Sequence, residues 1–584
     1  MNSTKIVATI GPASESEETL KHMILNGLNV ARLNFSHGTH DEHQVRIDRI
    51  KKVSKELGIP VAIMLDTKGP EIRIGRFREG PIRIEQGQKF ILTTDDILGD
   101  QNMVSVSYDG IINDVELGGR LLIDDGLVEF EIVNIFSNSI ELRAINSGEL
   151  SDRKGVNIPG AKIKLPTLTE QDISDIKFGI KNNVDFLAAS FIRNRNDVLS
   201  IRKILEENGG YQISIISKIE NQEGLDNLDD ILAVSDGIMV ARGDLGVEIP
   251  PQNIPHVQKE IIKKCNFANK VVITATQMLD SMTRNPRPTR AEVMDVANSI
   301  LDGTSAVMLS GESAAGKYPV ESIKMMRSIS ISTEESPEYE RMQRDRVDIN
   351  RITVTNAIAE ATYSIAKDLH AAAIISATSS GQTARALSKF KPRQPIIAIT
   401  DDERVERKLT MEWGVFPVII KGIDNANELF KAGIEKCKDI YFKEGDLVAL
   451  TAGIPFSKSG STNLLRVEVI AKMMTKGMGI GSGKITGRAV VANSQEELLR
   501  DFKDGDIIVT LGMDRDMTPY AQRASALVTE EGGLTSSGAI IGLSLGLPTI
   551  VGANDCTKEI KTGDIITVDI PSGQVFKGSV ENVW

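Results

Sequence analysis

The sequence has few cysteines, no long apolar run and no excess of basic charge. Its three cysteines, Cys265, Cys437 and Cys556, lie far apart without a C-x-x-C pair, which argues against a disulfide framework and against a thiolate metal site. Lysine and arginine number 68 against 80 aspartates and glutamates, and the resulting net charge of -12 argues against a general electrostatic grip on nucleic acid or anionic lipid. No segment approaches the roughly 18 apolar residues of a membrane span.

The N-terminal segment also lacks the charged lead, apolar core and small-residue cleavage site of a secretory signal. We therefore expect a cytoplasmic protein that binds neither membranes nor nucleic acid. The chain has 584 residues, of which 41% are hydrophobic and 25% charged, a globular composition with room for three or four domains.

Eight short apolar runs are each followed by a helix-like segment. They are Lys5–Gly11, Val30–Gly38, Val61–Asp66, Val184–Phe191, Ile213–Glu220, Gly237–Asp244, Lys270–Gln277 and Ser305–Gly311. Near-continuous apolar strands imply burial on both faces, as in a parallel sheet. Eight such βα units predict an α/β chain built on a TIM (β/α)8 barrel.

The third and fourth runs are more than a hundred residues apart, which requires an insertion between them. Alternating stretches within it predict a small all-β domain, a β-barrel lid; they are Ile72–Ile74, Lys89–Leu92, Leu121–Ile123 and Ile140–Leu142. We expect residues 1–68 and 167–340 to form the catalytic barrel and residues 69–166 the lid.

A second α/β domain is expected at 341–475. A charged stretch after Ser336-Pro337 leads into a helix at Val354–Leu369. Strands are predicted near Ala372–Ser376, Pro395–Thr400, Val415–Ile420 and Leu447–Thr451. The Gly-rich stretch Lys476–Gly487 reads as a linker into a final swivelling-type β/α domain at 476–584.

Polar side chains gather at the predicted strand ends, where TIM barrels carry out their reactions. They are three cations (Arg32, Arg73, Lys218), three carboxylates (Asp66, Glu220, Asp244) and four neutral oxygens (Asn34, Ser36, Thr67, Thr276). This mixture suits a phosphorylated substrate held with hard metal ions. The alternative is that each residue is one half of a salt bridge that closes the barrel mouth, which fits single residues better than the whole set.

Seven strand-end motifs resemble those of the pyruvate kinase family, in family order, from the N-terminus to about Lys476. They are ARLNFSHG (31–38), MLDTKGPEIR (64–73), GVNIPG (155–160), ISKIENQEG (216–224), MVARGDLGVEIP (239–250), ATQMLDSM (275–282) and MLSGESAAGKYP (308–319). The resemblance implies transfer of a phosphoryl group from phosphoenolpyruvate to ADP, which gives pyruvate and ATP in the last step of glycolysis.

The resemblance also implies roles for individual residues. Glu220 and Asp244 match the family's ligands to a divalent cation, Mg²⁺ or Mn²⁺. Lys218 matches the lysine beside the transferring phosphoryl group, and Arg32 and, less directly, Arg73 would grip the same group.

Two more features of the substrate site follow from the same match. The main-chain amides around Gly243 and Asp244 match those that bind the substrate carboxylate. Thr276 matches the threonine near the face on which enolpyruvate is protonated, although a hydroxyl is too weak an acid to act without a water relay, so the proton donor stays open.

A potassium site is implied by Asn34, Ser36, Asp66 and Thr67, which together offer neutral and anionic oxygens. Glu71 supports it, because glutamate at that position accompanies K⁺ dependence in this family whereas lysine replaces the ion.

Nucleotide contacts are expected from Arg73, Lys154 and His37. A lone histidine in a loop is more often structural, so His37 has that alternative as well.

The segment TSSGQTAR (378–385) resembles the family's effector loop. Its hydroxyls and amides at a helix N-terminus suit a phosphorylated metabolite, and an ordinary helix cap is the alternative. The expected effector-binding residues are Thr378, Ser379, Ser380, Gly381, Gln382 and Thr383. A homotetramer is implied by the resemblance alone.

The C-terminal region holds two motifs that fail on inspection. GMGIGSGKITG has Met478 and Ile485 at positions where a P-loop needs glycine and Ser/Thr. Residues 516–552 resemble the phosphohistidine domain of phosphoenolpyruvate-utilising enzymes, but Ser537 and Gly538 stand at the histidine position and the one after it. Serine cannot form the labile phosphoramidate, so we expect a structural or regulatory domain.

Two other functions stay open at this point. A barrel aldolase or lyase that works through a metal enolate would use the same carboxylate pair but would not need ADP. A non-catalytic sensor would bind phosphorylated metabolites through TSSGQTAR, and the intact set of strand-end residues argues against it.

Overall fold

The computed structural model describes residues 2–344, 353–423, 425–453, 462–470 and 473–578. The chain divides into two compact units. One consists of Met1–Asn356, Thr378–Pro392 and Ile396–Lys421, and the other of Ala357–Ala377, Arg393–Pro395 and Gly422–Trp584. The four domain boundaries expected above stay a prediction.

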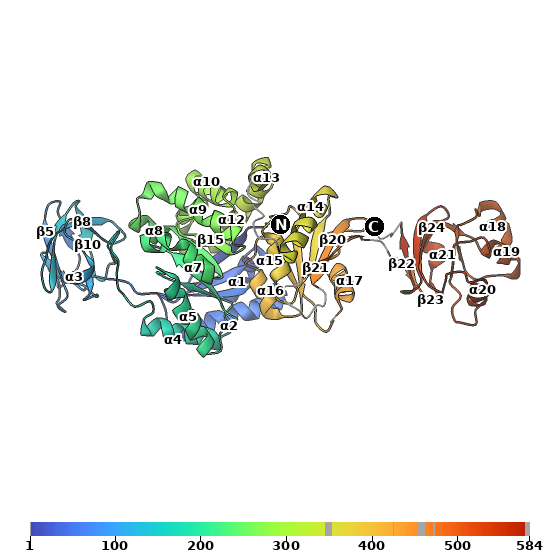
Figure 1. Cartoon of the computed structure of the whole chain (residues 1–584), viewed down its shortest axis with the longest axis horizontal. Helices are drawn as coiled ribbons and strands as arrows, with labels where there is room; N and C mark the ends of the chain where they lie inside the picture. The colour runs from blue at the N-terminus through green and yellow to red at the C-terminus, as the bar shows by residue number, and fades with distance from the viewer. Residues whose placement is uncertain (1, 345–352, 424, 454–461, 471–472, 579–584) are drawn as a thin grey trace. The chain divides into compact units, whose positions relative to one another are not determined.

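The predicted barrel is confirmed (Figure 1). Its closed sheet runs in the order β1-β16-β15-β14-β13-β12-β3-β2. The strands are β1 (Lys5–Thr9), β2 (Val30–Asn34), β3 (Ala62–Asp66), β12 (Phe186–Ala189), β13 (Ser214–Ile219), β14 (Gly237–Ala241), β15 (Val271–Ala275) and β16 (Ala306–Leu309). Each strand overlaps one of the eight apolar runs, and neighbouring strands are parallel.

Helices surround these strands. The main ones are α1 (Glu17–Leu25), α2 (His40–Leu57), α4 (Glu170–Lys181), α5 (Arg195–Glu207), α7 (Leu228–Val234), α9 (Ile254–Phe267), α10 (Arg290–Leu301) and α12 (Pro319–Glu334), with the shorter α6 (Gln222–Asp226), α8 (Arg242–Glu248) and α11 (Gly311–Ala314). Capping boxes begin four of them, at Thr39, Thr169, Asn194 and Thr289, and these satisfy main-chain amides that the first helical turn leaves unpaired.

Two apolar layers explain why the barrel strands are buried on both faces. Alternate residues of the strands, such as Val7, Val30 and Met64, pack together in one apolar cluster. Their neighbours in sequence, for example Ile6 and Ala31, belong to the larger cluster that includes the helices. Both faces of the barrel strands are therefore covered by apolar side chains, and polar residues such as Asn34 and Asp66 stand at the last position of their strands.

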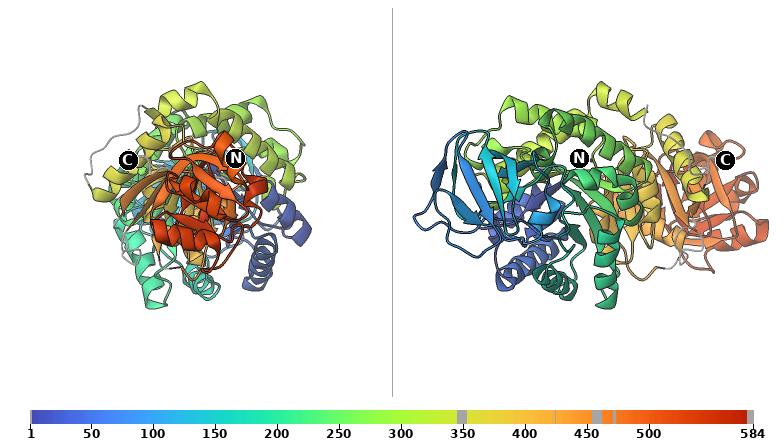
Figure 2. Two further views of the ribbon diagram at one scale, coloured as in Figure 1. Left: turned by 90° about the vertical axis from the view of Figure 1, so that its right-hand side faces the viewer. Right: turned by 60° about the vertical axis from the view of Figure 1, so that its left-hand side comes forward.

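The insertion is an all-β domain, as predicted. Its strands form a six-stranded sheet in the order β11-β7-β8-β9-β5-β6 and a two-stranded sheet, β10-β4, rather than one closed ring of paired strands (Figure 2). They are β4 (Ile82–Ile84), β5 (Lys89–Thr93), β6 (Met103–Ser105), β7 (Arg120–Ile123), β8 (Val128–Ile135), β9 (Ser139–Ala144), β10 (Gly148–Leu150) and β11 (Val156–Asn157), with the short helix α3 (Ile111–Asp114). The expected strand Ile72–Ile74 contributes only isolated bridges, Arg73 to Gly155 and Ile74 to Val106.

A second sheet follows, in the order β19-β18-β17-β20-β21. Its strands are β17 (Ala373–Ala377), β18 (Ile396–Thr400), β19 (Val415–Ile419), β20 (Leu447–Gly453) and β21 (Thr462–Val469). Its helices are α14 (Val354–Asp368), α15 (Gln382–Ser388), α16 (Glu403–Leu409) and α17 (Ala426–Cys437). The four predicted strands are confirmed, and the antiparallel edge strand β21 was not predicted. Within the charged stretch after Ser336-Pro337, α13 (Pro337–Arg344) is helical, and residues 345–352 lie outside the described residues.

The C-terminal region contains an eight-stranded sheet in the order β22-β29-β28-β24-β25-β26-β27-β23. Its strands are β22 (Met473–Lys476), β23 (Met478–Ile480), β24 (Lys484–Val491), β25 (Ile507–Thr510), β26 (Ala526–Thr529), β27 (Thr549–Val551), β28 (Ile565–Asp569) and β29 (Gln574–Lys577). Its helices are α18 (Gln495–Asp501), α19 (Thr518–Ala521), α20 (Ser537–Leu545) and α21 (Cys556–Glu559).

The interpretation of Lys476–Gly487 as a linker is wrong. This stretch supplies the end of β22, all of β23 and the start of β24. Its glycines allow close packing of main chains: a Cβ on Gly479 would lie 1.8 Å from the carbonyl oxygen of Ile570, and one on Gly477 would lie 2.5 Å from that of Val551. Glycine here marks the close approach of two backbones.

Among the described residues, no helix is both long and apolar enough to cross a membrane.

Candidate active site

The carboxyl ends of β2 and β3 carry the first ion pair of the site. The two strands are in register, with Asn34 opposite Asp66. Arg32 Nε donates to Asp66 Oδ2 at 2.6 Å, and Arg32 Nη1 donates to Thr9 Oγ1 at 2.8 Å. Asp66 is fully buried. Burial opposes its ionisation, but Arg32 and Lys218 outweigh that effect and hold the pKa of Asp66 below its usual value.

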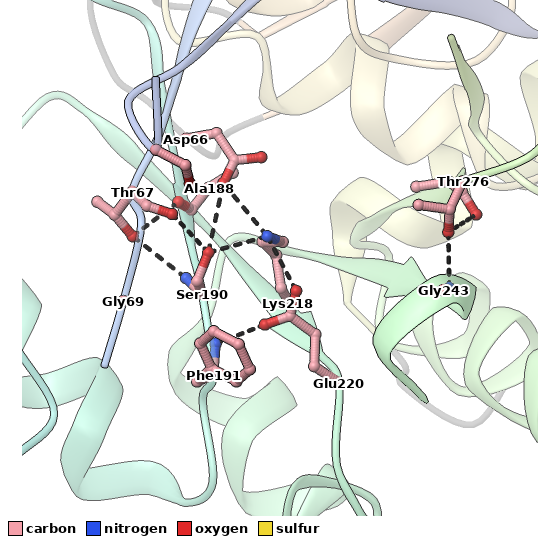
Figure 3. Close-up of polar contacts among 12 residues, drawn as sticks. Asp66, Thr67, Gly69, Ala188, Ser190, Phe191, Lys218, Glu220, Gly243 and Thr276 are labelled. Carbon is pink, nitrogen blue, oxygen red and sulfur yellow. Dashed lines mark hydrogen bonds and ion pairs between the residues drawn. The ribbon is translucent and has the colours of Figure 1, made fainter. Parts of the chain in front are cut away.

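Lys218, on β13, places its ammonium among three acceptors (Figure 3). Its Nζ lies 2.8 Å from Ser190 Oγ, 2.9 Å from Glu220 Oε1 and 3.3 Å from Asp66 Oδ1. An ammonium has three protons, so each can be directed to one oxygen. Burial disfavours the charge, but Asp66 and Glu220 outweigh burial and raise the pKa of Lys218 above its ordinary value. The side chain therefore stays cationic at neutral pH.

Glu220 and Asp244 form the pair of carboxylates expected to bind a divalent cation. Glu220 is 1% exposed, and its Oε2 accepts from the amide of Phe191 at 2.6 Å. Burial, together with the charge of Asp244, raises the pKa of Glu220, and burial also raises the pKa of Asp244. Two desolvated carboxylates side by side favour a cation between them, and their hard oxygens fit Mg²⁺ or Mn²⁺.

Glu220 and Asp244 alone would supply only part of a metal coordination sphere. In the described part of the chain, His, Cys, Asp and Glu side chains form no group of three or more that could hold a metal ion. A site with two carboxylates leaves the other positions to substrate and water, as is usual where Mg²⁺ binds together with phosphate.

Thr276 lies in a second group of contacts (Figure 3). Its hydroxyl accepts from the amide of Gly243 at 2.9 Å and donates to the carbonyl of Ala275 at 2.6 Å. The φ angle of Thr276 is 67°, a left-handed conformation that is costly for a β-branched residue. Arg242 stabilises this turn, since its guanidinium donates to the carbonyls of Ala275 and Thr276 and pairs with Asp295 at 2.6 Å. Backbone strain of this kind is found at functional sites.

The four residues expected to bind potassium lie at the ends of β2 and β3. Asn34 Oδ1 accepts from the amide of Ser36 at 3.1 Å, and the amide of Thr67 donates to the carbonyl of Ala188 at 3.0 Å. The set comprises an amide oxygen, two hydroxyls and a carboxylate. This donor chemistry fits a monovalent cation that prefers hard, mostly neutral oxygens.

A cavity of about 360 Å³ opens between the lid strands and the barrel. Arg73, Lys154, Glu71 and Asp244 are among the residues that line it. Arg73 pairs with Glu71, at 2.7 Å from Nε to Oε2, and Lys154 pairs with Asp124 at 2.9 Å. His37 lies outside this cavity, exposed in the turn after β2. The structure thus brings two of the three expected nucleotide residues to one cavity.

The expected effector loop joins β17 to α15. Gly381, with φ 80°, precedes the helix, and its amide donates to Thr378 Oγ1 at 2.9 Å. Arg385 donates to the carbonyl of Ser380 and pairs with the partly buried Glu412 at 2.9 Å. The loop is therefore held at its two ends by its own side chains.

Three contacts of the site were not predicted from the sequence: those of Ser190 and Phe191 with Lys218 and Glu220, and that of Thr9 with Arg32. All three residues lie at the end of a predicted strand run or directly after one, which was the signal that could have found them. Serine and threonine are so frequent there that position alone does not distinguish them.

In the C-terminal region, Ser537 is the first residue of α20. Its hydroxyl donates to Glu531 Oε2 at 2.7 Å.

The comparisons with family models cover most of the chain. Residues 1–323 match the pyruvate kinase barrel domain, and residues 356–468 match the pyruvate kinase alpha/beta domain. The chain belongs to the pyruvate kinase family. Residues 502–573 match the mobile domain of PEP-utilising enzymes, which confirms the resemblance of the final domain to that class.

Pyruvate kinases of several bacteria align with this chain along almost its whole length. The pyruvate kinase of Sporosarcina psychrophila is 50% identical over 581 residues, which cover 99% of both chains. That of Geobacillus stearothermophilus is 48% identical over 578 residues, 98% of both. A crystal structure of a pyruvate kinase from Cryptosporidium parvum is 40% identical with a TM-score of 0.77, and the match covers 80% of this chain and 96% of that one.

Proposed function

We propose that this chain, an enzyme of the pyruvate kinase family, transfers the phosphoryl group of phosphoenolpyruvate to ADP at the carboxyl end of its barrel. The observation that carries the proposal is the buried network in which Lys218 lies among Asp66, Ser190 and Glu220, with Arg32 on the far side of Asp66. So many buried charges cost free energy in a purely structural role, and they suit a site that receives a highly charged substrate.

Lys218 and Arg32 have the charge that phosphoryl transfer requires. The transition state is largely dissociative and spreads negative charge over three equatorial oxygens, so that fixed cations stabilise it. Lys218 is the more direct candidate, because its raised pKa keeps it charged and its three contacts hold it in place. Arg32 would contact the same group from β2.

Glu220 and Asp244 would hold Mg²⁺ or Mn²⁺. A divalent ion bound there supplies positive charge to the oxygens of the substrate. The amides around Gly243 and Asp244 would bind the substrate carboxylate, since they lie in the first turn of α8, where main-chain N–H groups are not used by the helix. The amide of Gly243 donates to Thr276 Oγ1 at 2.9 Å, so the substrate would have to share or replace that hydrogen bond.

Thr276 would lie near the carbon that is protonated. Its hydroxyl proton is directed to the carbonyl of Ala275, so direct donation to the substrate would first require that bond to break. A water relay that uses the hydroxyl for orientation is the role that its contacts support.

Asn34, Ser36, Asp66 and Thr67 would bind K⁺, and Arg73 and Lys154 would bind the phosphates of the nucleotide. The side chains of Arg73 and Lys154 both line the cavity between the lid and the barrel, and Asp244 lines it as well. His37 is exposed and outside that cavity, so its proposed contact with the nucleotide would require the turn after β2 to approach the ligand.

Pyruvate formation from phosphoenolpyruvate and ADP, followed with Mg²⁺ and with or without K⁺, tests the proposal. Turnover that needs ADP, Mg²⁺ and K⁺ supports the proposed reaction, the divalent-cation site and the potassium site. Turnover of an enolate substrate without ADP would favour a lyase instead. Absence of turnover in every mixture would favour a sensor that binds phosphorylated metabolites.

We also propose regulation by a phosphorylated metabolite at Thr378–Thr383, in a cytoplasmic homotetramer. The composition of the loop and the left-handed Gly381 support a phosphate-binding turn. Activation by AMP, ribose 5-phosphate or fructose 1,6-bisphosphate that is lost in Thr378→Ala would support it, and light scattering would give the subunit number.

The final domain is proposed to have no carrier role. Its position for a phosphohistidine is occupied by Ser537, whose hydroxyl is engaged by Glu531. A carboxylate beside that hydroxyl would also repel an incoming phosphoryl group.

A further inference from the structure

The turn that follows β12 contacts two of the side chains proposed for catalysis. Ser190 Oγ lies 2.8 Å from Lys218 Nζ, and the next residue, Phe191, donates its amide to Glu220 Oε2 at 2.6 Å (Figure 3). Both partners are almost fully buried, with exposed side-chain fractions of 12% for Lys218 and 1% for Glu220. Ser190 therefore contacts Lys218, the cation proposed to stabilise the transition state, and Phe191 contacts Glu220, a proposed metal ligand.

The hydroxyl of Ser190 has a fixed direction. Ser190 Oγ lies 2.6 Å from the carbonyl oxygen of Thr67, which can only accept, so the hydroxyl proton points to that carbonyl. A lone pair of the same oxygen is then left for the ammonium of Lys218. In return, the amide of Ser190 donates to Thr67 Oγ1 at 3.2 Å. Two hydrogen bonds between Ser190 and Thr67 thus connect the ends of β12 and β3.

The direction of the Phe191 amide depends on an unusual backbone conformation. Phe191 has a φ angle of 53°, which an aromatic residue rarely adopts. This conformation accompanies the short contact between its N–H and the carboxylate of Glu220. Strain that persists beside a buried carboxylate is evidence that the surrounding structure enforces it.

Gly69, where the chain leaves the barrel for the lid, is packed directly against this turn. A Cβ at Gly69 would lie 2.8 Å from the ring of Phe191 and 2.9 Å from Ser190 Cβ, so glycine is required there. Gly69 itself has a φ angle of 72°, and its amide donates to Asp172 at 3.0 Å. The start of the lid is therefore packed closely against this turn.

We propose that Ser190 and Phe191 are positioning residues for phosphoryl transfer: the hydroxyl of Ser190 orients the ammonium of Lys218, and the amide of Phe191 orients the carboxylate of Glu220. Gly69 keeps the turn in place from the lid side. The inference rests on the proposed roles of Lys218 and Glu220.

Ser190→Ala tests the first half, with Ser217→Ala as the matched control. Ser217 is a buried serine directly before Lys218, and its hydroxyl pairs with Ser235 at 2.7 Å, away from the site. We expect Ser190→Ala to lower kcat about 10- to 100-fold, as for the loss of a hydrogen bond to a charged group, with KM for phosphoenolpyruvate changed less than about threefold. Ser217→Ala should lower the thermal midpoint and leave kcat unchanged.

Mn²⁺ binding without substrate, measured by electron paramagnetic resonance, separates the two halves. Ser190→Ala should bind Mn²⁺ as the wild type does, because the amide of Phe191 still holds Glu220. Gly69→Ala should displace the whole turn, and we expect it to weaken Mn²⁺ binding and to lower kcat. Phe191→Gly keeps the amide and favours the left-handed conformation, so Mn²⁺ affinity should be retained.

The inference is overturned if Ser190→Ala has a kcat within twofold of wild type, or if Gly69→Ala keeps both kcat and Mn²⁺ affinity. The two Mn²⁺ measurements on Gly69→Ala and Phe191→Gly still decide the second half if Ser190→Ala does not fold. A wild-type chain that forms no pyruvate from phosphoenolpyruvate and ADP would instead refute the proposed function, and the inference with it.

Discussion

Arg32 Nε and Asp66 Oδ2 lie 2.6 Å apart between two adjacent barrel strands, and the other oxygen of the same carboxylate faces the ammonium of Lys218 at 3.3 Å. One buried carboxylate therefore contacts two cations, and Glu220, at 2.9 Å, is the second carboxylate beside Lys218.

Asp66→Asn should both destabilise the chain and inactivate it. The variant keeps the shape of the side chain but removes the carboxylate that pairs with Arg32 and one of the two carboxylates beside Lys218. Loss of one partner of a buried ion pair costs about 3–5 kcal/mol. Urea unfolding and pyruvate formation measure the two effects. Asp48→Asn, an exposed carboxylate on α2, should change neither. Wild-type stability in Asp66→Asn would contradict the assigned charge balance.

Lys218→Met should separate two reactions. Phosphoryl transfer should fall by at least about 100-fold, because a fixed cation beside the transferring group is lost. Exchange of the methyl protons of added pyruvate, followed by NMR in D₂O, should persist in part, since Glu220 and Asp244 remain. Equal loss of both reactions would remove the specific role given to Lys218. Lys203→Met, an exposed lysine on α5, is the control.

Glu71→Lys should relieve the requirement for K⁺. A lysine there would supply the positive charge that the ion provides, so turnover in tetramethylammonium buffer should approach that of the wild type in K⁺. Because Glu71 also pairs with Arg73, KM for ADP should rise. Glu149→Lys, at an exposed position of strand β10, should leave the K⁺ requirement as it is. An unchanged requirement in Glu71→Lys would mean that the potassium site has been misplaced.

Lys5→Met should change how stability depends on pH. Lys5 is fully buried, donates to the carbonyl of Val415 at 2.6 Å and lies over the ring of Phe416, with Glu334 and Glu412 as the nearest acids. Burial outweighs both acids and lowers its pKa to about 7.

Between pH 7 and the higher pKa of the unfolded chain, only the unfolded state carries this proton, so the free energy of unfolding rises with pH by at most about 1.4 kcal/mol per pH unit. The thermal midpoint of the wild type relative to that of Lys5→Met should therefore increase from pH 7 to pH 9. If the thermal midpoints of the wild type and of Lys5→Met change with pH in parallel, the pKa of Lys5 is the same in the folded and unfolded states.

Truncation after Ile470 should leave turnover intact. All residues proposed for catalysis precede Arg284, and Ile470 closes the second sheet through hydrogen bonds with Gly445 and Asp446. The cut must lie before β22, since that strand belongs to the C-terminal sheet. A shorter chain that ends at Gly453 loses the edge strand β21 and should be less stable. A truncation after Ile470 that folds but has lost turnover would show that the last domain takes part in catalysis.

The barrel was predictable because its signal is local and repeated. A run such as Val61–Asp66 is almost continuously apolar and ends in a polar residue, and near-continuous apolar runs are typical of parallel strands that are buried on both faces. Lys218, Glu220 and Asp244 were predicted as site residues in the same way, since a charged side chain stands out in an otherwise apolar run.

The contacts of Ser190, Phe191 and Gly479 could not be predicted in this way. Ser190 is a common residue, and its importance comes from Thr67 and Lys218 on two other strands. Phe191 contributes a main-chain amide, which every non-proline residue has. In the sequence, Gly479 resembles part of a flexible linker. Only the structure shows that the main chain of Ile570, far along the sequence, leaves no room for a side chain at this position.

The lid interrupts the barrel between two strands that pair directly: Met64 of β3 lies opposite Phe186 of β12. Everything between residues 66 and 186 must therefore be looped out before this pairing can form, and closure of a long flexible loop costs entropy. A lid that collapses first on its own core of Phe90, Phe130 and Leu142 brings its two ends together and shortens that loop. We therefore expect the inserted lid to fold before the barrel, with barrel closure as the late, slow step of refolding.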